Sequence, residues 1–423
     1  MDHDVAIIGC GRVGLPLALS FAERGLRTLG VENDPERLSA VRGARMPFDE
    51  PGAQDALERV TAAGTIAWTD RAADAARAEH IVITLGTPSF SHIEIDMRDI
   101  RSALDDLLPV LQPGHTLILR STIAPGTTDF VAGYLAKHRG FEIGEDVFVA
   151  HVPERIAAGR FMEEIVSLPC IVGGVGERSG EAAARLFEVF GAPIRQTTPI
   201  QAELAKIWTN ILRYAMFALP NRLMMECEMY GANVFEVIDL INRDYPRGGM
   251  PQPGFTAGTC LRKDFTFSEE RSPAPGMLLA VSRVHESVPL FIVEGLKRRL
   301  GSLEGRKVAV LGLAFKADTD DERDSLAHKL IRLLERELAD VAVHDPLVQT
   351  PTQSFGEAVL DAEAVVIATN HSAFRGAGVL RAIADSAKAD AIIADPWDTF
   401  GAAQVFGYAP EIAALARVGG LES

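Results

Sequence analysis

The opening segment, "DVAIIGCGRVGLPLALSFAERGLRTLGVEND", constrains the fold more than any other stretch, because it reads as strand, glycine turn, helix and second strand. The run Val5–Ile8 is typical of a buried strand, and the apolar spacing after Gly14 is helical. Gly9, Gly11 and Gly14 form a G-x-G-x-x-G turn between these two elements. The alternative for the glycines is a purely structural turn. With a strand before them and a helix after them, they predict that the backbone approaches a pyrophosphate, as in a dinucleotide-binding unit.

An acidic residue stands where such a unit recognises ribose. Glu32 ends the second predicted strand, where a carboxylate accepts hydrogen bonds from a ribose 2′-hydroxyl and repels a 2′-phosphate. We therefore expect NAD rather than NADP. Asp34, two residues later, fits a turn or a helix cap better. The other residues expected to contact the cofactor are Arg12, Val13 and Thr87.

The chain divides into three parts. Apolar runs such as "HIVITLG" (80–86) alternate with helix-like segments, which indicates a parallel, doubly wound sheet. From about residue 200 long helices take over, with a kink expected at Pro220, until "GRKVAVLGLAFK" (305–316) restarts the strand–turn–helix pattern. We predict an α/β fold with two Rossmann-like, doubly wound parallel-sheet domains joined by a helical middle domain. The expected NAD-binding, helical and C-terminal Rossmann-like domains cover 1–199, 200–300 and 301–423.

Charge and cysteine content exclude several classes of partner. The net charge of −16 over 423 residues argues against nucleic acid or an anionic membrane as a general partner. The four cysteines lack metal-ligand spacing and are too few for a disulfide scaffold, so we expect reduced thiols and no metal site. No leader precedes the first strand, and no apolar run approaches membrane-spanning length. These features predict a cytoplasmic protein.

A single cysteine stands in the glycine-rich segment "GFTAGTCLRKDF" (254–265). Gly254 and Gly258 keep side chains away from the Cys260 sulfur, as an approaching substrate requires. Lys263 adds positive charge that favours a thiolate, and Asp264 offers a carboxylate for proton transfer. An inert buried thiol beside a solvated Lys–Asp pair remains the alternative.

A second pair of polar residues lies in "AELAKIWTN" (202–210). Lys206 and Asn210 are four residues apart and share one face of a predicted helix. Two such donors side by side can stabilise a developing oxyanion. The alternative is an exposed lysine above a capping asparagine.

Together these segments resemble the UDP-glucose/GDP-mannose dehydrogenase family, the nucleotide-sugar 6-dehydrogenases, in the family's order and over nearly the whole chain. The matching strings are "GCGRVGLPLA" (9–18), "STIAPGTT" (121–128), "PERIAAGR" (153–160), "AELAKIWTN" (202–210), "GTCLRKD" (258–264), "GLAFKADTDDERDS" (312–325), "HDP" (344–346) and "ATNHSAF" (368–374). The resemblance implies a four-electron oxidation of a sugar C6 alcohol to a carboxylate with two NAD+. A cysteine thiohemiacetal and a thioester are the intermediates.

The resemblance also implies roles for individual residues. Lys206 and Asn210 match residues that stabilise the oxyanion, and Asp264 matches a carboxylate that positions water or transfers a proton. Glu154 matches a glutamate of thioester hydrolysis, and Thr122 a residue that contacts both cofactor and water. The C-terminal domain would grip the nucleotide, and a homodimer would form through the middle helices. The expected UDP-sugar contacts are Glu154, Arg155, Lys206, Asn210, Arg247 (across the dimer interface), Gly258, Lys316 and Arg323.

The chain departs from the family pattern at several positions. Thr259 stands where histidine is frequent, and Arg120 where many members have glutamate or lysine. Asn221–Arg222 replaces an Asn-Glu pair, with Pro220 beside it. The string "PERIAAGR" favours a UDP-N-acetylhexosamine as substrate, while "CLRKD" favours UDP-glucose.

Two alternatives remain open. The β-hydroxyacid and 6-phosphogluconate dehydrogenases share a Rossmann unit followed by helices with a Lys-x-x-x-Asn pair, but they perform one oxidation and need neither Cys260 nor a third α/β domain. A non-catalytic sensor of nucleotide-sugar or NAD on the same scaffold would bind both ligands without reducing the cofactor.

Overall fold

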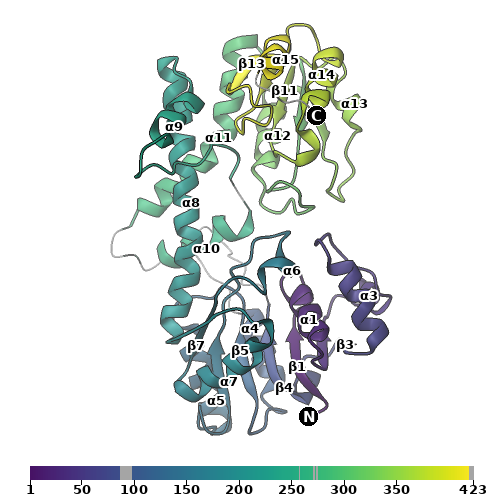
Figure 1. Ribbon diagram of the computed structural model, residues 1–423, viewed down its shortest axis with the longest axis vertical. Helices are drawn as coiled ribbons and strands as arrows, with labels where there is room; N and C mark the ends of the chain where they lie inside the picture. Colours follow the sequence, from purple (N-terminus) through teal and green to yellow (C-terminus); the bar gives the residue numbers. More distant parts are fainter. Residues whose placement is uncertain (86–97, 257, 270–271, 273–274, 419–423) are drawn as a thin grey trace. The chain divides into compact units, whose positions relative to one another are not determined.

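The computed structural model describes residues 1–85, 98–256, 258–269, 272 and 275–418 (Figure 1). The chain forms two compact units, Met1–Thr209 with Thr266–Arg271 and Asn210–Phe265 with Ser272–Ser423. The boundary between the units falls inside the long helix α8. The three-domain boundaries expected from the sequence therefore stay a prediction.

The first unit is built on an eight-stranded sheet with the order β3-β2-β1-β4-β5-β6-β7-β8. The sheet is parallel except where β7 runs antiparallel to β6. The segment between those two strands contains only the short helix α6 (Phe161–Glu164) rather than a full crossover helix. The strands are β1 (His3–Ile8), β2 (Thr28–Val31), β3 (Ile66–Thr69), β4 (Ala78–Ile83), β5 (Thr116–Leu119), β6 (Phe148–His151), β7 (Cys170–Gly174) and β8 (Ile194–Thr197).

Both faces of this sheet are buried, as expected for a doubly wound fold. Val5 and Ile7 pack against α1 and α7 on one face, whereas Ala6 and Ile8 pack with α4 and α5 on the other. The helices are α1 (Gly14–Glu23), α2 (Pro35–Arg42), α3 (Ala53–Ala63), α4 (Arg98–Leu107), α5 (Thr127–Arg139) and α7 (Glu177–Phe187), with 3-10 turns η1 (Ala72–Arg77) and η2 (Glu188–Phe190).

The middle of the chain is helical, as predicted. α8 runs from Pro199 to Tyr230 as one element that includes Pro220. It is followed by α9 (Val234–Asn242), α10 (Thr259–Glu269) and α11 (Met277–Leu300).

The second unit contains a five-stranded sheet with the order β10-β9-β11-β12-β13, parallel except for the last pair. Alternate residues of β9 face different cores: Val308 and Val310 pack with α11 and α12, and Ala309 and Leu311 with α14 and α15. The strands are β9 (Lys307–Leu311), β10 (Asp340–His344), β11 (Ala364–Ile367), β12 (Ile392–Ala394) and β13 (Phe406–Tyr408). The helices are α12 (Leu326–Arg336), α13 (Phe355–Val359), α14 (Ala377–Ser386) and α15 (Ala409–Val418), with the 3-10 turn η3 (Ser372–Phe374).

The predicted pair of Rossmann-like sheets and the helical region are therefore confirmed. Within the described residues, no helix has both the length and the apolar character needed to cross a bilayer. In the same part of the chain, no three His, Cys, Asp or Glu side chains are grouped so that they could hold a metal ion.

Candidate active site

The glycine turn after β1 has the geometry of a phosphate cradle. Gly9 has φ +96°, a left-handed conformation that favours glycine. A Cβ on Gly14 would lie 2.0 Å from the Gly9 carbonyl oxygen, so only glycine permits this approach of helix to strand. A Cβ on Gly11 would meet no atom closer than the Arg37 Nη1, at 3.8 Å, so the space in front of this backbone is open. The turn therefore fits the diphosphate of a dinucleotide at the N-terminus of α1.

The residue predicted to contact the ribose lies directly after β2. Glu32 is buried, and its Oε1 accepts a hydrogen bond from the Asp34 N–H at 2.9 Å. Asp34 caps α2, as predicted, by accepting from the N–H groups of Glu36 and Arg37. In the turn itself, the Arg12 guanidinium lies 5.0 Å from the centre of the Phe48 ring.

Two further residues complete the expected cofactor contacts. Val13 is half-buried in the glycine turn, immediately before α1. Thr87 lies outside the described residues.

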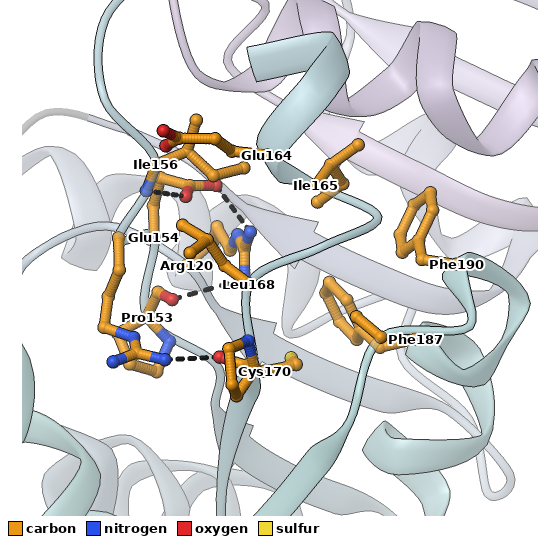
Figure 2. A pocket seen from close by; sticks show the side chains of 13 residues that line it. Arg120, Pro153, Glu154, Ile156, Glu164, Ile165, Leu168, Cys170, Phe187 and Phe190 are labelled. Carbon is orange, nitrogen blue, oxygen red and sulfur yellow. Dashed lines mark hydrogen bonds and ion pairs between the residues drawn. The ribbon is translucent and has the colours of Figure 1, made fainter. Parts of the chain in front are cut away.

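The loops after β5 and β6 bring Glu154 beside an arginine that is not among the predicted site residues (Figure 2). Glu154 is buried; its Oε2 accepts from Arg120 Nη2 at 2.5 Å, and its Oε1 accepts from the Ile156 N–H at 2.7 Å. Arg155, half-buried on the same loop, donates to the Pro169 carbonyl.

A shallow pocket adjoins this ion pair. Its polar side is formed by Arg120, Glu154 and Arg155, and Phe187 and Phe190 belong to its apolar side. Figure 2 shows the two phenylalanine rings across the pocket from Glu154.

Helix α8 is tied to the loop that carries Thr122. Glu203, near the start of α8, accepts hydrogen bonds from the N–H groups of Gly126 and Thr128 at 2.7 and 2.9 Å. Lys206, almost one turn further along α8, is buried, and Thr122 is half-buried. The N-terminal part of α8 is thus anchored to the segment that begins at residue 121.

One buried histidine lies near these groups. Burial lowers the pKa of His151 to about 3, and the positive charges of Arg120 and Lys206 act in the same direction. The ring is therefore neutral at neutral pH. Its Nδ1–H donates to the Leu119 carbonyl at 2.9 Å.

In the second unit, Cys260 is exposed in the first turn of α10. Asp264 lies one turn later on the same helix and is fully buried. Asn210 of α8 donates from Nδ2 to Asp264 Oδ2 at 2.5 Å. The structure thus brings together three of the predicted catalytic residues on two adjoining helices.

The segment before Cys260 is fixed at its two glycines. Asn221 Nδ2 donates to the Gly254 carbonyl at 2.9 Å, and Asn221 Oδ1 accepts from the Gly254 N–H at 2.8 Å. A Cβ on Gly254 would lie 2.2 Å from the Trp397 ring, and one on Gly258 would lie 2.5 Å from the Phe315 ring. Phe315 and Trp397 belong to loops at the carboxyl edge of the second sheet.

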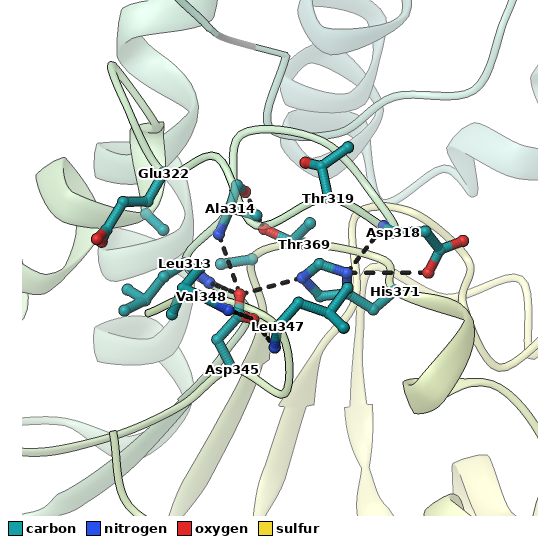
Figure 3. A network of polar contacts seen from close by, with 12 residues as sticks. Leu313, Ala314, Asp318, Thr319, Glu322, Asp345, Leu347, Val348, Thr369 and His371 are labelled. Carbon is teal, nitrogen blue, oxygen red and sulfur yellow. Dashed lines mark hydrogen bonds and ion pairs between the residues drawn. The ribbon is translucent and has the colours of Figure 1, made fainter. Parts of the chain in front are cut away.

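The loop that carries Phe315 is held by a buried Asp–His pair, Asp345 and His371 (Figure 3). His371 Nδ1 accepts from the Asp318 N–H at 2.9 Å, so Nε2 carries the proton and donates to Asp345 Oδ2 at 3.1 Å. The same oxygen accepts from the N–H groups of Leu313 and Ala314 at 2.6 and 3.0 Å. Burial acts to raise the pKa of Asp345, but these hydrogen bonds outweigh it and hold the pKa well below its usual range.

Lys316 and Arg323 lie on the loop that this network supports. Lys316 is half-buried directly after Phe315. Arg323 is exposed and makes two hydrogen bonds to Asp321, from Nε at 2.8 Å and from Nη2 at 2.7 Å. Arg247 is exposed after α9, where its Nε donates to the Tyr245 hydroxyl at 2.9 Å.

Four residues with structural roles at the site were not predicted as functional. The sequence marks Arg120 and Asn221 only as departures from the family pattern, and Asp345 and His371 only as parts of the matching strings. Each acts through a contact with a residue far away in sequence. The sequence signal that could have identified them is a polar residue inside an otherwise apolar segment, where its side chain would be buried.

Comparisons with known proteins cover all three parts of the chain. Sequence profiles of the UDP-glucose/GDP-mannose dehydrogenase family match the NAD binding domain at residues 3–191, the central domain at 200–285 and the UDP binding domain at 309–402.

Individual relatives resemble the chain over most of their length. The UDP-N-acetyl-D-mannosamine dehydrogenase of Pyrococcus horikoshii is 32% identical over 378 residues, which cover 88% of this chain and 90% of that protein. The NDP-N-acetyl-D-galactosaminuronic acid dehydrogenase of Ralstonia solanacearum is 30% identical over 391 residues, which cover 88% of this chain and 91% of that protein. A solved structure of the UDP-D-ManNAc dehydrogenase from P. horikoshii matches with a TM-score of 0.86 at 31% identity, covering 93% of this chain and 94% of that one.

Proposed function

The chain belongs to the UDP-glucose/GDP-mannose dehydrogenase family, whose members are NAD-dependent nucleotide-sugar dehydrogenases, and on this premise we propose the finer reaction that it performs. The reaction is the four-electron oxidation of the C6 hydroxyl of a UDP-N-acetylhexosamine to a carboxylate, through a thiohemiacetal and a thioester on Cys260. Support for the N-acetylhexosamine comes from relatives named for N-acetylmannosamine and N-acetylgalactosaminuronic acid.

The observation that carries the proposal is the hydrogen bond between Asn210 and Asp264. It joins α8 to the helix that presents Cys260 at its first turn. Cys260 and Asp264 are one turn apart on α10 and therefore share a face of the helix. A nucleophile, a carboxylate and an amide donor then stand together, which covalent catalysis on a carbonyl requires.

When bound, NAD+ would supply the hydride acceptor for each of the two oxidations. The residues that would hold it are those of the glycine turn and Glu32, whose geometry fits a diphosphate and a ribose. The acidic residue favours NAD over its 2′-phosphorylated form.

The residues of the chain bind and stabilise the groups that form at C6 of the sugar. In the first oxidation the C6 hydroxyl loses its proton as C6 becomes an aldehyde carbon. The Cys260 sulfur then forms a bond to that carbon, and the carbonyl oxygen becomes an alkoxide, stabilised by Lys206 and Asn210 as donors before it takes up a proton. The thiohemiacetal carbon again carries a hydrogen, so the second oxidation gives a thioester.

Hydrolysis releases the product. A water molecule adds to the thioester carbon, the carbon–sulfur bond breaks, and the sulfur leaves as a thiolate with one proton released. Glu154 and Thr122 orient the water, and Asp264 accepts its proton. Glu154 is suited to orientation, because Arg120 and the Ile156 N–H hold its two oxygens in fixed directions.

The C-terminal sheet is assigned to the UDP group. The UDP binding domain profile covers residues 309–402, and the loops at the carboxyl ends of β9, β10 and β11 are where open α/β sheets bind ligands. Lys316 and Arg323 on this edge supply positive charge for the diphosphate. Arg155 and Gly258 are proposed to contact the sugar.

We also propose that the enzyme is a homodimer through α8. Six large apolar side chains at spacings of three or four residues are exposed along this helix and form a stripe that winds gradually around it. They are Ile200, Leu204, Trp208, Leu212, Met216 and Leu219. A second copy of the helix would cover this stripe, and Arg247 would reach the partner's active site. Light scattering on a size-exclusion column tests this assembly.

A substrate panel tests the reaction. Purified protein is mixed with UDP-N-acetylmannosamine, UDP-N-acetylgalactosamine, UDP-N-acetylglucosamine, UDP-glucose or GDP-mannose and NAD+, and NADH and product mass are measured. The proposal expects two NADH per uronate formed, with an N-acetylhexosamine as the preferred substrate. One NADH per sugar would support a single-step dehydrogenase, and preference for UDP-glucose would overturn the substrate assignment.

A further inference from the structure

We propose that Arg120 is a positioning residue for thioester hydrolysis and acts through Glu154. This inference rests on the proposed function, because it assigns Glu154 to the hydrolytic step. It adds the residue that fixes the direction in which the Glu154 carboxylate faces.

The contacts link residue 120 to the whole segment that leads to Glu154. Arg120 Nη1 donates to the carbonyls of Val152 and Pro153 at 3.1 and 3.3 Å, and Nη2 donates to Glu154 Oε2 at 2.5 Å. The main chain adds a further bond, from the Glu154 N–H to the Arg120 carbonyl at 3.2 Å. One guanidinium therefore sets both the backbone path and the side-chain direction of Glu154 (Figure 2).

The surroundings make this pairing strong. The Arg120 side chain is 4% exposed and the Glu154 side chain 11% exposed, so water screens their attraction little. The guanidinium also lies 5.1 Å from the centre of the Phe187 ring, which restricts its own movement. An arginine confined in this way holds its partner in one direction, as a catalytic carboxylate requires.

The other hydrogen bond of the Glu154 carboxylate shows what would orient it if Arg120 were replaced. Its Oε1 accepts from the Ile156 N–H, which lies on the same loop as Glu154, only two residues away. Without the guanidinium, the hydrogen bond that remains to the carboxylate among the described residues comes from its own loop. Misplacement of a catalytic group by about 1 Å can slow a step about 10²-fold.

The test separates hydrolysis from oxidation. Single-turnover reactions of the wild type, Arg120→Met, Glu154→Gln and the double variant are followed for NADH and, after quenching, for sugar mass on Cys260. We expect Arg120→Met to form two NADH at the wild-type rate but to lose the acyl group about 10²-fold more slowly. Glu154→Gln should behave in the same way, and the double variant should be no slower than Glu154→Gln alone.

A matched control and a conservative variant guard against a general loss of structure. Arg139 also donates to a backbone carbonyl, that of Leu111 at 3.0 Å, and lies 5.0 Å from the Phe141 ring. Within the described part of the chain it forms no ion pair with a carboxylate. Arg139→Met should leave hydrolysis unchanged. Arg120→Lys keeps the charge and should recover part of the rate; it replaces Arg120→Met if that variant does not fold.

Several results would overturn the proposal. One is normal hydrolysis in Arg120→Met while Glu154→Gln accumulates adduct, which leaves the proposed function intact. A second is a double variant in which the slowing of hydrolysis equals the product of the two single effects. A third is equal slowing of hydrolysis and of both steps that form NADH. If no variant, including Glu154→Gln, ever carries sugar mass on Cys260, the proposed mechanism fails together with this inference.

Discussion

Asn221 and Gly254 exchange two hydrogen bonds, one in each direction, at 2.9 and 2.8 Å. Asn221 is fully buried and Gly254 is buried, so neither backbone group of Gly254 has water as an alternative partner. His285 completes the contact by accepting from Asn221 Nδ2 at 3.2 Å. A side chain of α8 thus fixes the segment that leads to Cys260.

Replacing Asn221 should weaken both stability and catalysis. Asn221→Ala leaves the buried Gly254 N–H without its partner and removes one of two donors to the Gly254 carbonyl, the other being the Thr256 N–H. We expect the free energy of unfolding to fall by about 1–3 kcal/mol. Because the cysteine segment loses its anchor, kcat should fall as well. Urea unfolding and NADH formation measure the two effects. Arg222→Ala is the control, since Arg222 is exposed and forms an ion pair with Glu226 on the same helix. Comparable losses in both variants would contradict the assignment.

Gly258→Ala should disturb the site for two reasons. Gly258 has φ +96°, and an added Cβ would lie 2.5 Å from the Phe315 ring. We expect at least a tenfold loss of kcat together with reduced thermal stability. Gly301→Ala, at φ +80° with no neighbour within 4 Å, carries the backbone strain without the clash. If Phe315→Leu does not restore part of the activity of Gly258→Ala, the ring is not the limiting contact.

His285 should give a measurable pH dependence of stability. An unfolded histidine has a pKa of about 6.5, and burial lowers the pKa of His285 to about 4 in the folded protein. Stability from the neutral ring is therefore complete above pH 6.5 and is lost as the pH falls towards 4, at up to about 1.4 kcal/mol per pH unit. Urea unfolding of the wild type and His285→Gln should show a difference that shrinks across this window. A constant difference would show that the ring is not held neutral.

Alkylation should single out one cysteine. Cys260 is exposed at the start of a helix, where the dipole favours a thiolate. Burial raises the pKa of Cys10, Cys170 and Cys227 and makes their thiols inert. Iodoacetamide at neutral pH should add one carbamidomethyl group per chain, located at Cys260 by peptide mapping, and Cys260→Ala should resist labelling. Label distributed over several cysteines would argue against a selectively reactive thiol.

Lys206→Ala should slow turnover strongly without loss of NAD+ binding. Removing one donor to an oxyanion costs roughly 10²–10³-fold in kcat. Steady-state kinetics and NAD+ titration measure the effect, with the exposed Lys137→Ala as control. A decrease of less than about tenfold would assign Lys206 to packing of α8 instead.

Much of the fold was predictable because it depends on local patterns. The strand–turn–helix segments at Gly9 and at 305–316 follow from residue spacing, and the structure confirms both as the first elements of their sheets. The direction of β7 was not predictable in this way. It depends on a connection with one short helix, whereas the sequence pattern only indicated another strand.

The site was predictable residue by residue but not as a set of contacts. Cys260, Asp264 and Asn210 could be nominated from their types and spacing. The partner of Asn210 is 54 positions away, and Arg120 meets Glu154 across 34 positions, so packing alone decides these pairs. Thr259, the departure next to the nucleophile, has no structural explanation here.

The two glycines of the cysteine segment have a consequence for transplanting this chemistry. Each is pressed against an aromatic ring from a different loop, Trp397 for Gly254 and Phe315 for Gly258. A graft of residues 254–264 onto another scaffold would bring the sulfur but leave behind the two flat surfaces that shape its backbone. Moving the nucleophile to another scaffold would therefore require three chain segments: residues 254–264 and the loops that carry Phe315 and Trp397.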